Sequence, residues 1–399
     1  MDIPHVSLIR RYRLVVSPAL GAAAIGHFIL ELCNNYLPAI YPVLVTSLGL
    51  TYTQIGTLSL LASISGTLPQ PLMGYLADRQ DNRFWGTFSL IWVGVVMGLV
   101  GLTNGYVMLA IMVTLGSLAS ATFHPVGAAA ASAASQSHRG IAMSLFSVGG
   151  NLGAALSPLL IAAMLSTAGL RGTLVLVPIG VSMGLLLFRW FPRGGVDAAE
   201  AARRRAVARH SRISGLILAM VIAMMHSYLH RSFTTYLPLL YQSRGESLVA
   251  GSASLSVMLF SLGLGSITGG MLADHIGRWQ TELITFLAMP LVLIAFLHAP
   301  GWMLLPLVAL FGVLTGMPFP INLVMGNESW PHMPAVASGL VLGTSWLIGG
   351  LGAWFTGYLA DHFGLVPALS SLVIPALLAA AAAVAYRWFG APNPRRSRP

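Results

Sequence analysis

The sequence predicts an all-α membrane protein with 12 transmembrane helices in two pseudo-symmetric six-helix bundles. Of its 399 residues, 56% are hydrophobic and only 8% are charged, whereas soluble domains carry about 25% charged residues. Apolar stretches recur from Leu14 to Trp388, and each has the roughly 18 residues that a helix needs to cross the hydrocarbon core of a bilayer. Continuous apolar runs favour helices over a membrane β-barrel, whose strands show short alternating segments.

Twelve apolar spans follow one another along the chain. The first six cover residues 15–44, 52–77, 86–103, 106–134, 140–167 and 171–191. The other six cover residues 213–241, 247–273, 280–299, 301–329, 335–360 and 366–389. With this count the arginine-rich loops and both termini fall on one side of the membrane, which is an internal check on the number twelve.

The basic residues identify that side as the cytoplasm. All 21 are arginine, and they gather at the N-terminus, in loops such as those at Arg139 and Arg278, and in the C-terminal tail. Such a positive excess is typical of cytoplasmic loops. The net charge of +10 therefore indicates a lipid bilayer as the partner and not nucleic acid.

The N-terminal apolar stretch runs past the length of a signal-peptide core, so we expect it to be retained as the first span. Cys33 is the only cysteine, which excludes an intrachain disulfide. Because Cys33 lies in an apolar helix, we expect it to pack as a small hydrophobic residue.

One long polar stretch divides the chain. We expect residues 1–191 to form an N-terminal six-helix bundle and residues 213–399 a C-terminal six-helix bundle with a basic tail. Residues 192–212, which are rich in arginine, are expected to be a solvated cytoplasmic linker. An amphipathic piece of this linker on the anionic lipid surface is an alternative.

Internal repeats relate the two halves. Residues 34–41 (NNYLPAIY) match residues 234–241 (TTYLPLLY). In this register Glu31 falls on Arg231, so an acid and a base occupy equivalent positions inside apolar spans. Ionisable residues inside a membrane are candidates for function by default, and two of opposite sign suggest a polar site between the halves.

A second repeat links the loops. Gly74-Tyr75-Leu76-Ala77-Asp78 is echoed at residues 270–274. A third copy, identical to the first, stands at residues 357–361 and ends on the opposite membrane face. Repeats of this kind, including inverted repeats within each half, are the expected build of secondary transporters.

The first of these segments, with Arg79 after it, resembles the loop signature between helices two and three of the major facilitator superfamily. Asp81 stands where a glycine is usual, and the second copy has His275 in place of the arginine. The resemblance implies a cytoplasmic gate, and we add Glu328 of span ten as a partner for Arg278. The expected gate residues are Asp78, Arg79, Arg83, Asp274, Arg278 and Glu328.

Within the superfamily, the chain is similar to the fosmidomycin-resistance group of bacterial exporters. The resemblance is carried by His27, Glu31, Tyr41-Pro42, Gln54-Ile55-Gly56, Gln70-Pro71, Phe123-His124-Pro125, Ser147–Gly153, Ser232-Phe233-Thr234, Asn327-Glu328 and Ser338-Gly339-Leu340. Val126 replaces the acidic residue that follows Phe-His-Pro in the group, so proton coupling would have to differ here. Gly140, Gly149 and Gly153 match part of an antiporter glycine pattern, although close helix packing explains them equally well.

Glu31, His27 and His124 are the candidates for proton coupling. His27 and Glu31 are four residues apart and share one helix face. A carboxyl group in apolar surroundings takes up a proton more readily, and a nearby cation opposes this, while histidine titrates near neutral pH. The alternative is that Glu31 forms a permanent ion pair with Arg231 that only fixes the packing.

Arg231, His226 and His230 are the candidates for binding an anionic group of the substrate. An arginine can hold a carboxylate or a phosphonate through two parallel hydrogen bonds. The spacing of His226 and His230 also suits a metal ion, but no cysteine or supporting carboxylate pattern accompanies it, and we expect no metal. Further substrate contacts are expected from the polar residues Asn34, Asn35, Tyr36, Tyr236 and Asn151.

We therefore expect a secondary active transporter that exports a small anionic or amphipathic compound, such as an antibiotic, in exchange for protons by alternating access. A proton-coupled importer of an organic acid or a metal–ligand complex is the alternative. No nucleotide-binding motif and no catalytic constellation stand out, so we expect neither an enzyme nor a cofactor. We expect a monomer in the bacterial inner membrane, and the arginine-rich loops predict that both termini lie in the cytoplasm.

Overall fold

The computed structural model describes residues 17–79, 82–134, 139–191, 212–331 and 333–390. Within these ranges every regular element is a helix. The N-terminal helices are α2 (Pro18–Asn34), α3 (Leu37–Leu48), α4 (Tyr52–Thr67), α5 (Gln70–Arg79), α6 (Asn82–Gly98), η1 (Leu99–Leu102), α7 (Tyr106–Ala134), α8 (Arg139–Ala168), η2 (Gly169–Val175) and α9 (Leu176–Leu187). The C-terminal helices are α11 (Ile213–Ser243), α12 (Leu248–Ile276), α13 (Arg278–His298), α14 (Gly301–Gly316), α15 (Pro318–Ser329), α16 (Pro334–Phe363), α17 (Leu365–Ser370) and α18 (Val373–Phe389).

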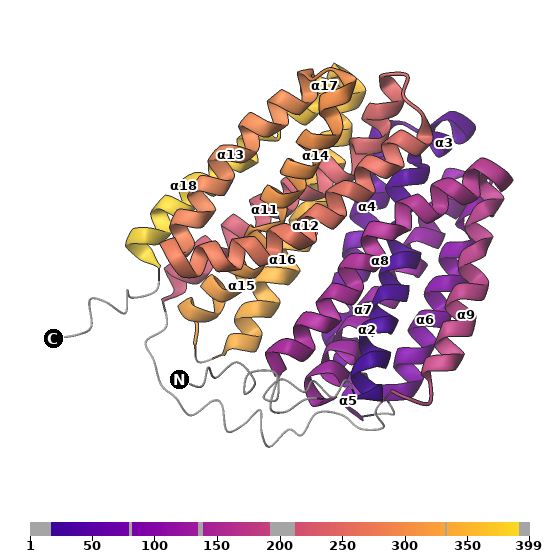
Figure 1. Cartoon of the computed structure of the whole chain (residues 1–399), viewed down its shortest axis with the longest axis horizontal. Coiled ribbons are helices and arrows are strands. Elements are labelled where there is room, and N and C mark those ends of the chain that lie inside the picture. The colour runs from indigo at the N-terminus through magenta and orange to yellow at the C-terminus, as the bar shows by residue number, and fades with distance from the viewer. Residues whose placement is uncertain (1–16, 80–81, 135–138, 192–211, 332, 391–399) are drawn as a thin grey trace, which may run out of the picture.

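The helices form two groups that lie side by side (Figure 1). In the first group α2 packs on α6, α7 and α8, and α6 packs on α9. In the second group α11 packs on α15, α16 and α18, and α12 packs on α14. The groups meet along α4–α16, α8–α12 and α3–α11. This arrangement confirms the predicted all-α membrane class, while the boundary at residues 192–212 stays a prediction because residues 192–211 lie outside the described ranges.

Ten helical segments in the described ranges are long and apolar enough to cross a membrane. One of them, Ile141–Leu187, has 47 residues and contains both α8 and α9, whereas a single crossing needs about 20. The consecutive helices α4 and α5 are not among the ten. The count of twelve is compatible with these segments and stays a prediction.

Several spans are interrupted at prolines. Span one breaks between α2 and α3 at Asn35 and Tyr36, just before Pro38. Span two breaks at Pro69, between α4 and α5, and span ten breaks before Pro318. Proline lacks the N–H that the helix ladder needs and clashes with the carbonyl four residues earlier. The interruption in span one matters most, because it falls within the residues predicted to bind protons and substrate.

Glycines bring α8 close to α2. A methyl group on Gly149 would lie 2.3 Å from the carbonyl oxygen of Ala24, and one on Gly153 would lie 2.1 Å from that of Phe28. Larger side chains at these two positions would force the helices apart. Close packing therefore accounts for this part of the glycine pattern.

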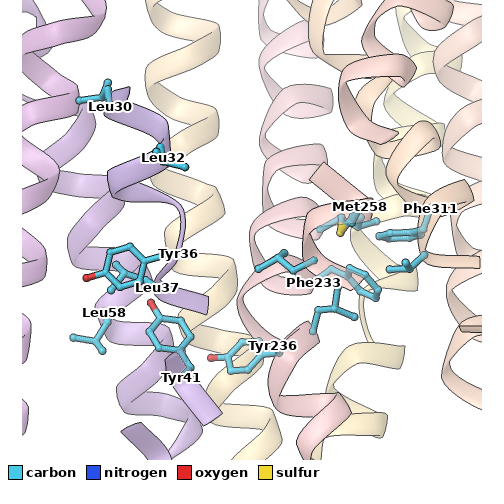
Figure 2. Close-up of a cluster of buried hydrophobic side chains, with 14 of the residues drawn as sticks. Leu30, Leu32, Tyr36, Leu37, Tyr41, Leu58, Phe233, Tyr236, Met258 and Phe311 are labelled. Atoms are coloured by element: carbon cyan, nitrogen blue, oxygen red, sulfur yellow. The ribbon is translucent and has the colours of Figure 1, made fainter. Parts of the chain in front are cut away.

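The core runs through both groups. Figure 2 shows one part of it, where Tyr36, Leu37 and Leu58 belong to the first group, and Phe233 and Met258 belong to the second. All five are at most 5% exposed. Cys33 is buried as well, in agreement with a packing role.

Candidate functional site

The three residues predicted to couple protons meet in one cluster. Glu31 stands in the last turn of α2, and its Oε1 lies 3.0 Å from Nε2 of His124 on α7. The same oxygen lies 3.5 Å from Nε2 of His27, one turn earlier on α2. Asn35 donates from Nδ2 to the other carboxylate oxygen, Oε2. The carboxylate is therefore held by groups of its own half.

His27 is locked in orientation. Its Nδ1 lies 2.9 Å from the carbonyl oxygen of Phe146, and its ring stacks on the Phe146 ring with centroids 4.1 Å apart. Gly150 makes room for it, because a methyl group there would lie 2.3 Å from the His27 ring. Since a carbonyl can only accept, Nδ1 carries the hydrogen, and Nε2 of a neutral His27 would face Glu31 as a second acceptor. The cluster thus has a place for one additional proton between His27 and Glu31.

The ligand atoms of His27, Glu31 and His124 all lie within 4.8 Å of one another. A bound metal ion would also tolerate this spacing. The contact between His124 and Glu31 already has the length of an ordinary hydrogen bond, so these two side chains can bind each other directly, without a metal ion between them. The expectation that the site holds no metal stays a prediction.

Arg231 lies on α11 in the other half. Its guanidinium carbon is 5.3 Å from the centre of the Trp346 ring of α16, a distance at which a cation is attracted to an aromatic face. Among the described residues no ion pair within 4.0 Å joins Arg231 to Glu31. The permanent ion pair considered from the sequence is therefore not formed in this conformation.

A cavity of about 90 Å³ lies between the halves. Asn34, Asn35 and Tyr41 line it from the first half, and His230 and Arg231 line it from the second. Four of the predicted substrate residues thus share one cavity. Its walls offer a cation on one side and two amides on the other, which suits a small anion that carries further polar groups.

The two asparagines differ in what they touch. Asn34 donates from Nδ2 to Oγ of Ser120 at 2.9 Å and has no hydrogen bond to an ionisable side chain in the described part of the chain. Asn35 donates to the Glu31 carboxylate and, at 3.1 Å, to the backbone carbonyl oxygen of Glu31. Asn35 is therefore the residue that touches both the cavity and the proton cluster.

The other predicted substrate residues lie elsewhere. His226 is 3% exposed, and its Nε2 donates to the carbonyl oxygen of Thr315 at 2.8 Å. Tyr36 donates to the carbonyl oxygen of Met97 at 2.6 Å. Tyr236 binds backbone carbonyls near the end of the interface, and Asn151 packs beside Gly263 of α12. None of these four lines the cavity, and their roles in substrate binding stay predictions.

One end of the interface is held closed by contacts that cross it. Asp361 of α16 accepts hydrogen bonds from the backbone N–H groups of Tyr52 and Thr53, both at 2.8 Å, and from the Thr53 hydroxyl at 2.6 Å. These N–H groups begin α4, where a carboxylate also meets the positive end of the helix dipole. Beside them the Tyr236 hydroxyl lies 2.9 Å from the Tyr52 carbonyl oxygen and 2.8 Å from that of Ala353.

The opposite end has no such crossing contacts among the described residues. There α5 packs on α6 and α7, and α15 packs on helices of its own group. The two ends lie at the top and bottom of Figure 1, near the labels α17 and α5. We call the end near α3 and α17 the closed end, and the end near α5 and α15 the parted end, because α5 and α15 each pack within their own group.

The predicted gate residues lie near the parted end. Arg278 and Glu328 form the ion pair expected from the sequence, although both belong to the second group. Arg83 lies over the Phe188 ring at 5.1 Å, and no described residue pairs with Asp274 in an ion pair. The side chains of Asp78 and Arg79 lie outside the described residues. The gating role of all six stays a prediction.

Two acidic residues were not singled out from the sequence. Asp361 ends the third copy of the Gly-Tyr-Leu-Ala-Asp segment, and that repetition was the signal that could have identified it. Glu282 of α13 is fully buried, and neither of its carboxylate oxygens has a hydrogen-bond partner among the described residues. The position of Glu282 inside an apolar span was the only sequence signal for it.

Comparison with known proteins agrees with this architecture. The sequence matches the Major Facilitator Superfamily over residues 23–353. It is 28% identical to the fosmidomycin resistance protein of Escherichia coli (strain K12), over 86% of each chain. It is 24% identical to the hexuronate transporter of the same strain, over 90% of this chain and 91% of the relative.

A solved structure shares the fold. The bacterial homologue of the human lysosomal transporter Spinster, described as inward-facing and unoccupied, superposes with a TM-score of 0.80 at 16% identity. The superposition covers 93% of this chain and 97% of the other. With its match to the family over most of its length and its two packed groups of membrane helices, the chain belongs to the major facilitator superfamily and is a multi-pass membrane transporter of small molecules.

Proposed function

We propose that the protein is a proton-coupled exporter that exchanges a small anionic or amphipathic compound, such as an antibiotic, for protons. The observation that carries this proposal is the locked orientation of His27, which leaves room for one proton between its Nε2 and Glu31. Arg231, across the same interface, offers a cation without an ionic partner among the described residues. The similarity to a fosmidomycin resistance protein supports export of an antibiotic.

Alternating access supplies the transport cycle. Asp361, Tyr236 and Tyr52 hold one end of the interface closed, and the solved relative with this fold is described as inward-facing. We take the closed end as the outer face of a bacterial inner membrane and the parted end as the cytoplasmic face, in line with the arginine-rich loops. Substrate would enter from the cytoplasm, and rocking of the two groups would present it outside.

The substrate and the proton occupy different groups in this scheme. An anion binds the guanidinium of Arg231, which can offer two parallel N–H donors. The proton binds within the cluster of Glu31, His27 and His124. Because Glu31 is held by His124, His27 and Asn35, the two sites are coupled through residues between them and not by exchange of one shared ion pair.

Everted membrane vesicles test the proton site. An imposed pH gradient, acidic inside, should drive accumulation of a labelled substrate found by screening a panel of small anionic antibiotics. In Glu31→Gln we expect gradient-driven accumulation to fall roughly a hundredfold, because a neutral amide cannot carry the proton, a loss on the scale of general acid–base defects. Exchange of labelled for unlabelled substrate without a gradient should persist.

Glu282→Gln is the matched control, because it removes the other buried carboxyl group, which does not line the cavity. It should keep the gradient response. Gradient-driven accumulation that survives Glu31→Gln and disappears in Glu282→Gln would move the proton site to α13 and refute the proposal.

Import of an organic acid together with protons is the second candidate. It is favoured by the similarity to a hexuronate transporter. The same labelled compounds in right-side-out vesicles with an inward proton gradient decide between the two. Accumulation there, and none in everted vesicles, would establish import.

A further inference from the structure

Four tyrosines stand at equivalent places in the repeated segments of spans one and seven. Tyr36 corresponds to Tyr236, and Tyr41 corresponds to Tyr241. The hydroxyls of Tyr36 and Tyr236 bind backbone carbonyl oxygens, and the hydroxyl of Tyr241 is buried away from the cavity between the halves. Of these four residues, Tyr41 is the one that lines the cavity.

The hydroxyl of Tyr41 is open to the cavity. Tyr41 as a whole is only 2% exposed, yet its hydroxyl makes no hydrogen bond in the described part of the chain and is not one of the unpartnered atoms that are sealed from solvent. Leu37, Pro38 and Tyr41 lie on one face of α3, and all three line the cavity. In Figure 2 the hydroxyl points back along span one towards Leu37. Because a phenol can donate a hydrogen bond, Tyr41 offers the cavity a donor.

Arg231 faces the same cavity from the other half. The Tyr41 and Arg231 side chains are close enough to interact electrostatically. The guanidinium packs on Trp346 and has no hydrogen-bond acceptor among the residues that the structure describes. A cation from one half and a neutral donor from the other thus meet at one cavity, and neither has an acceptor there.

The hydroxyls that the second half contributes to the cavity are already used. Thr234 and Thr235 are the two hydroxyl residues of that half in the cavity lining. The Thr234 hydroxyl donates to the carbonyl oxygen of His230 at 2.8 Å, and the Thr235 hydroxyl donates to Oγ of Ser59 at 3.3 Å. An uncommitted hydroxyl for a ligand bound to Arg231 therefore has to come from the first half.

We infer that Tyr41 donates a hydrogen bond to the anionic group that Arg231 binds, so that both halves hold one oxyanion of the substrate. An ionised carboxylate has two oxygens with about four acceptor sites, and a guanidinium fork occupies two of them. The O–H of Tyr41 occupies one of the remaining sites, and hydrogen bonds to an ionised acceptor are stronger than those to a neutral one. This inference rests on the proposed function, because it takes Arg231 as the substrate cation, and it narrows the substrate to a compound recognised by an oxyanion.

Calorimetric binding of butyrate and of butyramide to the purified full chain tests the inference. The two probes have nearly the same shape, and at about pH 7.5 butyrate is ionised while a tyrosine hydroxyl is neutral. Butyrate should bind the wild type more tightly than butyramide does. Tyr41→Phe should weaken butyrate binding roughly tenfold, which corresponds to about 1.4 kcal/mol. Butyramide binding should change much less, because its oxygen carries no full charge.

Two further variants separate donation from packing. Tyr241→Phe is the matched control, because it removes the equivalent hydroxyl of the second half, away from the cavity, and it should leave both affinities unchanged. Incorporation of 3-fluorotyrosine at position 41 keeps the shape and makes the phenol a stronger donor, so it should tighten butyrate binding. Weaker butyrate binding in the fluorinated protein, or an equal loss in Tyr41→Phe and Tyr241→Phe, overturns the inference.

Arg231→Ala distinguishes a failure of this inference from a failure of the proposed function. If Arg231→Ala weakens butyrate binding and Tyr41→Phe does not, Arg231 remains the substrate cation and Tyr41 is not its partner. If neither variant weakens butyrate binding, or if the wild type binds butyrate no better than butyramide, the anion site itself is wrong and the inference fails with it.

Discussion

Span one (α2 and α3) and span seven (α11) occupy equivalent places in the two halves, yet their polar residues contact different partners. In span one Glu31 binds His124, and Tyr36 binds the Met97 carbonyl, both within the first group. In span seven Tyr236 reaches the Tyr52 carbonyl and Gln242 reaches the Pro42 carbonyl at 3.1 Å, both across the interface. Figure 2 shows the hydroxyl of Tyr36 turned away from the second group and that of Tyr236 turned towards the first.

The backbone accounts for part of this difference. Span one contains Pro38 and Pro42 within one turn, and its helix is interrupted. Span seven contains only Pro238, and α11 continues through it to Ser243. The interruption lets Asn35 fold back onto Glu31, whereas the continuous helix presents its C-terminal half to the other group. The interrupted span one thus keeps its polar contacts within the first group, and the continuous span seven makes its polar contacts across the interface.

The largest test of this comparison is Arg231→Ala. If Arg231 of span seven is the cation that binds an anionic substrate, its loss should lower the uptake of anionic substrates at least tenfold. A hydrogen bond to a charged group contributes about 1.5–3 kcal/mol. Uptake of neutral analogues should change little. Transport of a labelled anion and its neutral amide, measured in parallel, provides the readout. An equal loss for both would indicate that Arg231 serves folding.

The next test concerns the crossing contacts. Asp361→Ala removes the carboxylate that caps α4, a type of contact that stabilises by about 0.5–2 kcal/mol. The closed end should open several times more often. In a Cys33→Ala background, a cysteine at the buried position Ser59 would react faster with an impermeant maleimide added outside right-side-out vesicles. An unchanged labelling rate would show that Asp361 does not hold this end closed.

The smallest test compares the two tyrosines directly. Tyr236→Phe removes a hydroxyl that crosses the interface, and Tyr36→Phe removes one that does not. Both should lower stability by about 1 kcal/mol, the net value of a typical hydrogen bond, as followed by thermal unfolding in detergent. Only Tyr236→Phe should also raise labelling of the cysteine at position 59. The same increase in both variants would remove the distinction between the spans.

Helix positions were largely predictable from the sequence, because each apolar stretch is about as long as a helix that crosses the bilayer. The span predicted at 106–134 coincides with α7, and those at 140–167 and 301–329 differ from the structure by a few residues or by a break. The breaks themselves were not predicted, since a proline can stand at the start of a helix that follows a break, as Pro38 does, or lie inside a continuous helix, as Pro125 does.

Within the site, local spacing predicted more than long-range symmetry did. The spacing of four residues between His27 and Glu31 predicted that they share one helix face, and the structure places them in contact. His124, on another helix, also contacts Glu31. The equivalence of Glu31 and Arg231 did not make them partners, because symmetry relates positions and not distances. The repeated segment marks Asp361, but its partners could not be predicted, since they are backbone N–H groups some 300 residues away.

The crossing of α4 and α16 at Gly56 and Gly357 has a consequence for how such a protein can evolve. A methyl group on Gly56 would lie 2.6 Å from the Ala353 carbonyl oxygen, and one on Gly357 would lie 2.2 Å from the Tyr236 hydroxyl. A substitution of glycine by alanine at either place would therefore favour the conformation in which this end of the interface is open, without altering the cavity. Each 1.4 kcal/mol changes a population ratio tenfold. Single mutations far from the substrate cavity can therefore set the fraction of molecules in which the cavity is open to one side of the membrane or to the other.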